Sequence, residues 1–167
     1  MLIFCYGSNM LAGRLKHRIA SARKIGVAKL YKHVLKFHKV GMDSSGKSDI
    51  HYTGNRKDYA WGVVVEIDPA EKQILDEYED YGKGYSDKIV EVELDTGVRI
   101  KVLTYFALKT KPDLKPYDWY KDFVVVGAIE NRLPGGYIQY LQEVQSMQDS
   151  DYQRSQANRE VLYNLQP

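Results

Sequence analysis

The sequence has 167 residues, of which 44% are apolar and 28% charged, and its formal net charge is +2. These values fit one soluble globular domain over residues 1–167 with a single core. No apolar run approaches the roughly 20 residues that cross a membrane, and Leu2–Cys5 is too short for a signal-peptide core, so we expect neither a membrane partner nor secretion. Cys5 is the only cysteine, which excludes an internal disulfide and favours a reducing, cytoplasmic location.

The first turn of the chain has the pattern of an anion site. Leu2–Cys5 is typical of a short buried strand, and the turn-forming residues Gly7, Ser8 and Asn9 follow it. An amphipathic helix is predicted over Met10–Ala20, with Ser8 or Asn9 as its N-cap. Such a turn directs unpaired N–H groups at one point, which suits a carboxylate, a phosphate or a developing oxyanion. An ordinary capped strand–turn–helix has the same pattern, and this alternative stays open.

Charge is unevenly distributed along the chain. No Asp or Glu precedes Asp43, whereas nine Lys and Arg residues do, and the segment 66–95 is acidic. The asymmetry suits an anionic partner, and a small anionic substrate fits it, but solvated faces of a helix and two strands also explain it. We predict no nucleic-acid partner, because the chain has neither a G-x-x-x-x-G-K loop nor a G-x-G-x-x-G fingerprint.

Between residues 24 and 57 the sequence predicts two strands and a loop. The strands are expected over Lys24–Leu30 and His33–Lys39, and the turn-forming composition of Met42–Lys57 indicates a loop. The four histidines of the chain are scattered without a metal-ligand spacing, so no metal is predicted; they are His17, His33, His38 and His51.

The strongest strand pattern covers Tyr59–Ile67, and Gly62 within it indicates a bulge or a close backbone approach. A helix then begins, with Asp68 as N-cap and Pro69 at its first position, and is expected to end at Gly82. Its apolar stripe is predicted to comprise Ala70, Ile74 and Tyr78, with Leu75 beside it.

Four acids gather near the end of this helix: Asp76, Glu77, Glu79 and Asp80. At about 100° per residue, Glu79 lies about 40° from Leu75, on the margin of the buried face, while Asp76 and Asp80 face away. Burial and the helix C-terminus would raise the pKa of a carboxylate on that margin toward the range of a general base. Periodicity does not separate Glu79 from Glu77 on the opposite margin, nor a catalytic acid from a half-exposed surface acid.

The rest of the chain predicts a hairpin and three helices. Strands are expected over Asp87–Leu94 and Arg99–Leu108. Helices are expected over Asp118–Glu130 and Tyr137–Met147. Residues 148–167 form a polar C-terminal extension, for which we expect a packed or frayed helix rather than a second domain.

Three separated stretches resemble the γ-glutamylcyclotransferase family in order and spacing: Tyr6–Met10, Trp61–Val64 with the helix end Leu75–Glu79, and Gly127–Pro134. The resemblance implies an α+β fold, in which a small, mostly antiparallel, barrel-like sheet has helices packed outside and a pocket at one mouth. It also implies a homodimer. Members of the family convert γ-glutamyl amides into 5-oxoproline and a free amine.

Carried over to this sequence, the resemblance implies that Glu79 is the catalytic general acid and base. The substrate-binding positions that it implies are Tyr6, Gly7, Ser8, Asn9, Met10, Tyr85 and Tyr105. Many relatives have Gly after the catalytic Glu, whereas this chain has Asp80. The reaction is an internal attack that needs no nucleophile, cofactor or metal from the protein. The alternatives are the same fold acting on another γ-glutamyl amine or on glutathione, and a non-catalytic protein that binds a small carboxylate.

Overall fold

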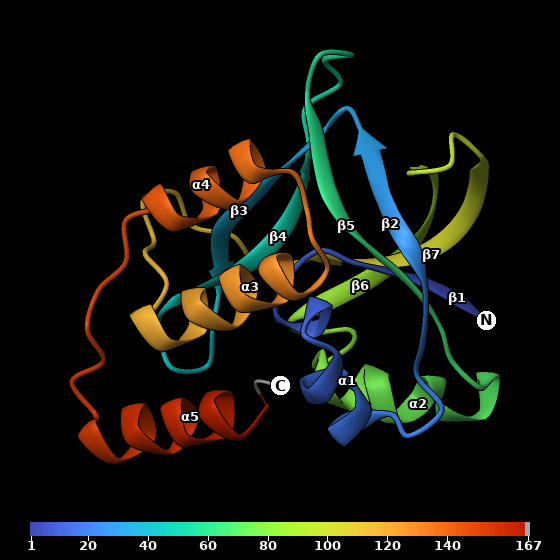
Figure 1. Cartoon of the computed structure of the whole chain (residues 1–167). Helices are drawn as coiled ribbons and strands as arrows, with labels where there is room; N and C mark the ends of the chain where they lie inside the picture. Colours follow the sequence, from blue (N-terminus) through green and yellow to red (C-terminus); the bar gives the residue numbers. More distant parts are fainter. Residues whose placement is uncertain (166–167) are drawn as a thin grey trace.

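The computed structural model describes residues 1–165, and five of its strands close into a barrel (Figure 1). The barrel strands are β1 (Leu2–Cys5), β2 (Arg23–Tyr31), β5 (Tyr59–Glu66), β6 (Tyr85–Leu94) and β7 (Arg99–Ala107). Their order is β1-β5-β2-β6-β7, and each neighbouring pair is antiparallel except β1 and β7, which run parallel. The predicted α+β class with a mostly antiparallel, barrel-like sheet is confirmed.

Gly62 allows two barrel strands to approach closely. A Cβ atom at this position would lie 2.4 Å from the Cys5 carbonyl oxygen and 2.6 Å from the Phe4 ring. The predicted close backbone approach at Gly62 is therefore confirmed. The side chains of Phe4, Val63 and Val64 are almost fully buried around this contact, which fixes β1 against β5.

Helices cover the outside of the barrel in two groups. They are η1 (Ser8–Met10), α1 (Ala12–Arg18), η2 (Pro69–Glu71), α2 (Lys72–Tyr78), α3 (Asp118–Glu130), α4 (Gly135–Glu143) and α5 (Tyr152–Leu165). α1 and α2 contact each other at one end of the barrel, whereas α3 packs against η1, α4 and α5 (Figure 1). Within residues 1–165, no helix is both long enough and apolar enough to cross a membrane.

The predicted loop over Met42–Lys57 is wrong, because it contains a strand. β3 (His33–Val40) pairs antiparallel with β4 (Gly46–Tyr52) in a separate two-stranded sheet. The buried positions of β4 include the polar residues Ser48 and Asp49. Their hydrogen-bond partners come from distant parts of the chain, so the apolar alternation on which strand prediction depends is missing.

The helix predicted over Met10–Ala20 is shorter, because η1 precedes it. α1 begins at Ala12, its N-cap is Leu11, and no side chain caps it. Ser8 and Asn9 therefore belong to a separate 3₁₀ turn and do not cap α1, which corrects the prediction. The helix predicted over Tyr137–Met147 likewise begins earlier, at Gly135, and ends at Glu143.

The start of the next helix follows the prediction, but its apolar stripe does not. Asp68 accepts a hydrogen bond from the Ala70 amide at 2.9 Å, so the predicted N-cap is confirmed. Of the stripe, Ala70 is exposed, Ile74 is 42% exposed and Tyr78 is 52% exposed, while Leu75 is buried. This two-turn helix buries only Leu75. The Tyr78 ring instead makes a cation–π contact with the Arg18 guanidinium, which lies 4.8 Å from the ring centroid.

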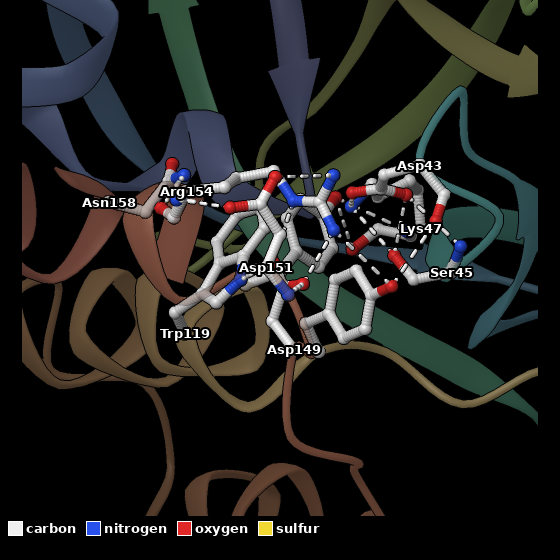
Figure 2. Close-up of polar contacts among 11 residues, drawn as sticks. Asp43, Ser45, Lys47, Trp119, Asp149, Asp151, Arg154 and Asn158 are labelled. Atoms are coloured by element: carbon white, nitrogen blue, oxygen red, sulfur yellow. Dashed lines mark hydrogen bonds and ion pairs between the residues drawn. The ribbon is translucent and has the colours of Figure 1, made fainter. Parts of the chain in front are cut away.

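The C-terminal extension folds back onto α3 as the predicted packed helix; its last two residues, 166–167, lie outside the described part of the chain. The Arg154 guanidinium makes two hydrogen bonds to the Asp149 carboxylate, which also accepts from Trp119 Nε1 at 2.9 Å (Figure 2). We call Trp119, Asp149 and Arg154 the C-terminal latch. Leu162 of α5 is buried beyond it.

The latch predicts a pH-dependent loss of stability in Asp149→Asn. The Arg154 hydrogen bonds hold the Asp149 pKa down to about 2, from an ordinary value of 3.8. The stabilisation is therefore complete above about pH 4 and is lost as the pH falls through about 2. We expect the variant to melt about 2–6 °C lower at pH 7. Thermal unfolding monitored by circular dichroism should show this difference narrowing between about pH 4 and pH 2; a constant difference would contradict the assignment.

Candidate active site

A cavity opens where β1 runs into η1, between the end of α2 and the strands β6 and β7. It is lined by Ile3, Phe4, Cys5, Tyr6, Gly7, Ser8, Asn9, Ser48, Leu75, Glu79, Tyr85, Tyr105 and Tyr120. The structure thus brings together all the sequence-predicted site residues except Met10. The Met10 side chain is 2% exposed and packs in the core against Gly127.

The turn at Gly7 is shaped by a close contact across the cavity. A Cβ atom at Gly7 would lie 2.9 Å from the Ser48 Cβ, so no larger residue fits without displacing β4. The Met10 amide donates to the Gly7 carbonyl at 2.9 Å and closes the 3₁₀ turn. The amides of Ser8 and Asn9 stand at the start of that turn, where a helix offers them no acceptor. Both residues line the cavity.

A helix ending places Glu79 at the cavity. The amide of Tyr81 donates to the Asp76 carbonyl at 2.9 Å, and that of Asp80 donates to the Glu77 carbonyl at 3.2 Å. This pair of bonds is a Schellman motif, which requires a left-handed residue at Asp80, where φ is +50°. Asp tolerates this conformation better than most side chains, although Gly is usual there. α2 therefore ends at Tyr78, before the predicted Gly82.

The Glu79 carboxylate is secluded, and polar groups oppose the effect of its burial. Its side chain is only 14% exposed, and Asn9 Nδ2 donates to Oε1 at 2.8 Å. Arg18 Nη1 donates to Asn9 Oδ1 at 3.0 Å and lies 3.9 Å from the same Glu79 oxygen. Burial raises the pKa of Glu79 above its ordinary value, while Arg18, Asn9 and, farther away, Lys39 lower it.

The other acids of α2 do not share this environment. Glu77 is exposed, so the structure places Glu79 rather than Glu77 on the cavity margin. Asp76 was expected to face away, and this is wrong, because its carboxylate accepts from the Tyr105 hydroxyl at 2.7 Å. Asp80 was also expected to face away, but it is only partly exposed and points toward Gly84, where a Cβ would lie 3.1 Å from its Oδ2.

Hydrogen-bonded tyrosines form the walls of the cavity. The Tyr6 hydroxyl donates to the Tyr105 carbonyl at 2.9 Å, which ties β1 to β7 beyond the end of their pairing. The Tyr85 hydroxyl donates to the Ser48 carbonyl at 2.7 Å. Both bonds are buried, so the rings are held in fixed positions around the space beside Glu79.

Sequence reasoning missed Ser48, Tyr120 and Lys39. Tyr120 Oη accepts a hydrogen bond from the Ser48 amide and lies 3.2 Å from the Ser48 Oγ. This contact was missed because Ser48 belongs to the strand that was predicted as a loop. Lys39 is 6% exposed, burial lowers its pKa, and its Nζ lies 4.8 Å from the Tyr85 ring centroid. Its signal was present in the sequence: Lys39 continues the alternation of Leu35 and Phe37 on the buried face of β3.

Cys5 also lines the cavity, and its thiol is buried. Burial, together with the charge of Glu79, raises the pKa of the thiol to about 12. It is therefore protonated at neutral pH and acts as a small apolar residue of the wall.

The cavity thus contains one secluded carboxylate, the turn residues Gly7, Ser8 and Asn9, and tyrosine rings that buried hydrogen bonds hold in place. The carboxylate can move a proton, and the amides can hold an anion or a developing negative charge. This arrangement suits acid–base chemistry on a small polar molecule.

Comparison with known proteins gives the family. Residues 59–141 match the model of the AIG2-like family. The human gamma-glutamylcyclotransferase is 30% identical over 160 residues, which cover 90% of this chain and 80% of that protein, and the bovine enzyme is 30% identical over 158 residues, with the same coverage. A solved structure named gamma-glutamyl cyclotransferase is 26% identical, with a TM-score of 0.84 over 95% of this chain and 98% of that one. The chain belongs to the gamma-glutamylcyclotransferase family.

The contact at Gly7 predicts that Gly7→Ala destabilises the protein. The added methyl group would meet Ser48 at 2.9 Å, and overpacking of this kind costs about 1–3 kcal/mol. Gly136→Ala is the matched control, because a Cβ there meets nothing within 4 Å; we expect no loss of stability. Urea unfolding of both variants measures the difference. Equal midpoints for the two variants would show that the turn does not need glycine.

Proposed function

We propose that this protein converts a γ-glutamyl amino acid or amide into 5-oxoproline and a free amine. The observation that carries the proposal is the position of Glu79: its secluded carboxylate lines one cavity together with the turn residues Gly7, Ser8 and Asn9. Membership of the gamma-glutamylcyclotransferase family supports the same reaction. In this proposal the cavity binds one bent γ-glutamyl group.

The reaction needs a proton carrier rather than a nucleophile. The substrate α-ammonium loses a proton to Glu79, and the freed amine attacks the γ-carbonyl carbon to close a five-membered ring. The carbonyl becomes a tetrahedral oxyanion. As it collapses, the bond to the leaving nitrogen breaks, and that nitrogen takes the proton back from Glu79. The new ring nitrogen still carries two hydrogens and passes one of them through Glu79 to the departing amine, so that 5-oxoproline keeps one N–H and the amine leaves as an ammonium ion. No water is consumed, and one carboxylate serves as base and then as acid, worth about 10²–10⁴-fold in rate.

The other residues of the site orient the substrate and stabilise charge. The Ser8 and Asn9 amides would hold the α-carboxylate or the oxyanion, and loss of one such donor typically costs about 10²–10³-fold. Tyr6, Tyr85 and Tyr105 surround the glutamyl chain and keep it folded for internal attack, since well-oriented intramolecular reactions gain about 7–11 kcal/mol. Asn9 fixes one oxygen of Glu79 at 2.8 Å, which leaves the other oxygen to face the substrate.

The leaving amine defines the remaining alternatives. Glutathione or another γ-glutamyl amine would undergo the same ring closure, because the chemistry is confined to the glutamyl half. A panel of γ-glutamyl amides that includes glutathione, assayed for 5-oxoproline, separates these substrates. If none of these amides yields 5-oxoproline while the protein binds 5-oxoproline measurably, the result would favour a binding protein.

Two further expectations accompany the proposal. We expect the enzyme to be cytoplasmic, where the thiol of Cys5 stays reduced. We also expect a homodimer, which sedimentation equilibrium would measure directly.

Glu79→Gln should abolish turnover and keep the fold. Glutamine retains the size of the side chain and a hydrogen-bonding oxygen, but it cannot accept the proton of the α-ammonium. We expect kcat to fall by at least about 10²-fold while 5-oxoproline binding persists. Glu77→Gln is the matched control, because Glu77 is exposed on the same helix, and its kcat should be unchanged. Wild-type turnover in Glu79→Gln would remove Glu79 from the mechanism.

The acid limb of the pH profile should follow the environment of Glu79. Because burial raises its pKa, the base form is lost at a pH above the ordinary 4.5, and kcat/KM should fall as the pH drops through that raised value. Arg18→Gln removes a charge that favours the ionised form, so the limb should move to higher pH. Lys16→Gln, on the exposed face of α1, should leave it in place. A shift of the Arg18→Gln limb to lower pH would contradict the assignment.

A further inference from the structure

The pairing of β3 with β4 gathers three potential metal ligands outside the cavity. Asp49 and His51 are two residues apart on β4, so their side chains share one face of the strand. His38 lies on the paired strand β3, which has an irregular register between Lys36 and Lys39. One ligand atom from each of His38, Asp49 and His51 lies within 4.8 Å of the other two. Sequence spacing did not predict this cluster, because β4 was not predicted as a strand.

The carboxylate of this cluster is already oriented. Asp49 is 5% exposed, and its Oδ1 accepts from the Ala107 amide at 2.8 Å. Its Oδ2 lies 2.7 Å from Nε2 of His38. Ligating carboxylates are generally held by such an outer hydrogen bond, which fixes the oxygen that faces the ion. The two imidazoles are more accessible, since His38 and His51 are both partly exposed, and an ion can reach them from solvent.

We propose that His38, Asp49 and His51 bind a divalent transition-metal ion, for which Zn²⁺ is the probe. Two imidazole nitrogens and one carboxylate oxygen suit Zn²⁺ and its neighbours, whereas Mg²⁺ and Ca²⁺ prefer oxygen ligands alone. Ligands at 2.0–2.2 Å from a tetrahedral ion lie about 3.3–3.6 Å apart. The separations, which are at most 4.8 Å, must therefore shrink by up to about 1.3 Å, while the 2.7 Å pair of His38 and Asp49 must widen by about 0.6 Å. Rotation of the partly exposed imidazoles supplies both movements.

Two lysines oppose the ion. Lys36 faces Asp49 directly in the β3–β4 register, and Lys88 lies close enough to interact with the Asp49 charge. Their charges weaken cation binding and tune the affinity of the site. Lys36 is exposed, so it can be changed without disturbing the core. Removing Lys36 should therefore increase the affinity for the metal ion. If His38 and His51 are only structural residues, removing Lys36 should have no such effect.

The cluster is separate from the catalytic residues. Ser48, beside Asp49 on β4, turns the other way and lines the cavity, whereas His51 does not line it. Replacing His51 should therefore leave 5-oxoproline formation unchanged. If the metal proposal is wrong, Zn²⁺ binding is absent while 5-oxoproline formation is unaffected. If the proposed reaction is wrong, 5-oxoproline formation is absent whatever the result of the Zn²⁺ titration.

The test is Zn²⁺ binding by the full-length protein, measured by isothermal titration calorimetry, with Co²⁺ absorption as a second readout. We expect His51→Ala to weaken binding at least about 10-fold. His17→Ala removes an exposed histidine from α1 and is the matched control, with unchanged binding. Lys36→Ala should tighten binding a few-fold.

Added Zn²⁺ should also raise the melting temperature of the wild-type protein but not that of His51→Ala, because an ion that binds only the folded state stabilises it. Absence of Zn²⁺ binding by the wild-type protein, or equal binding by wild type and His51→Ala, would overturn the proposal.

Discussion

The site depends on keeping one carboxylate away from water while it remains able to ionise. Burial disfavours the charge of Glu79, and the cations and the amide around it restore part of that cost. These groups come from four separate elements: Arg18 from α1, Asn9 from η1, Lys39 from β3 and Glu79 itself from the end of α2. The barrel end must bring them all to one place. The balance sets a proton affinity that a single surface acid would not have.

Strand β4 serves two faces of the molecule. On one face Ser48 uses its amide, carbonyl and hydroxyl with Tyr120 and Tyr85, so the walls of the cavity rest on one small polar residue. On the other face Asp49 is held by the backbone of β7 through Ala107. Satisfied buried polar groups of this kind specify a single arrangement, because each would be costly without its partner.

The elements with strong local patterns were predictable from the sequence, and those stabilised by distant partners were not. The strand at Tyr59 and the helix Asp118–Glu130 have apolar or helical patterns that need no outside information, and both are confirmed. β4 was missed because Ser48 and Asp49 are polar at buried positions, and two of their partners, Tyr120 and Ala107, lie more than 50 residues away in sequence. Helical angles placed Glu79 on a margin, but only the three-dimensional structure shows that Glu77 is exposed.

The junction between β1 and β7 closes the barrel with little bonding. These strands pair in parallel through Ile3 and Leu103, supported by the Thr104 hydroxyl, which donates to the Phe4 carbonyl at 3.0 Å. Every other junction of the barrel is antiparallel. The same junction continues into the cavity wall at Tyr6. Side-chain hydrogen bonds from Tyr6 and Thr104 take the place of the missing main-chain pairing, so the closure of the barrel and the shape of the cavity wall depend on the same pair of strand ends.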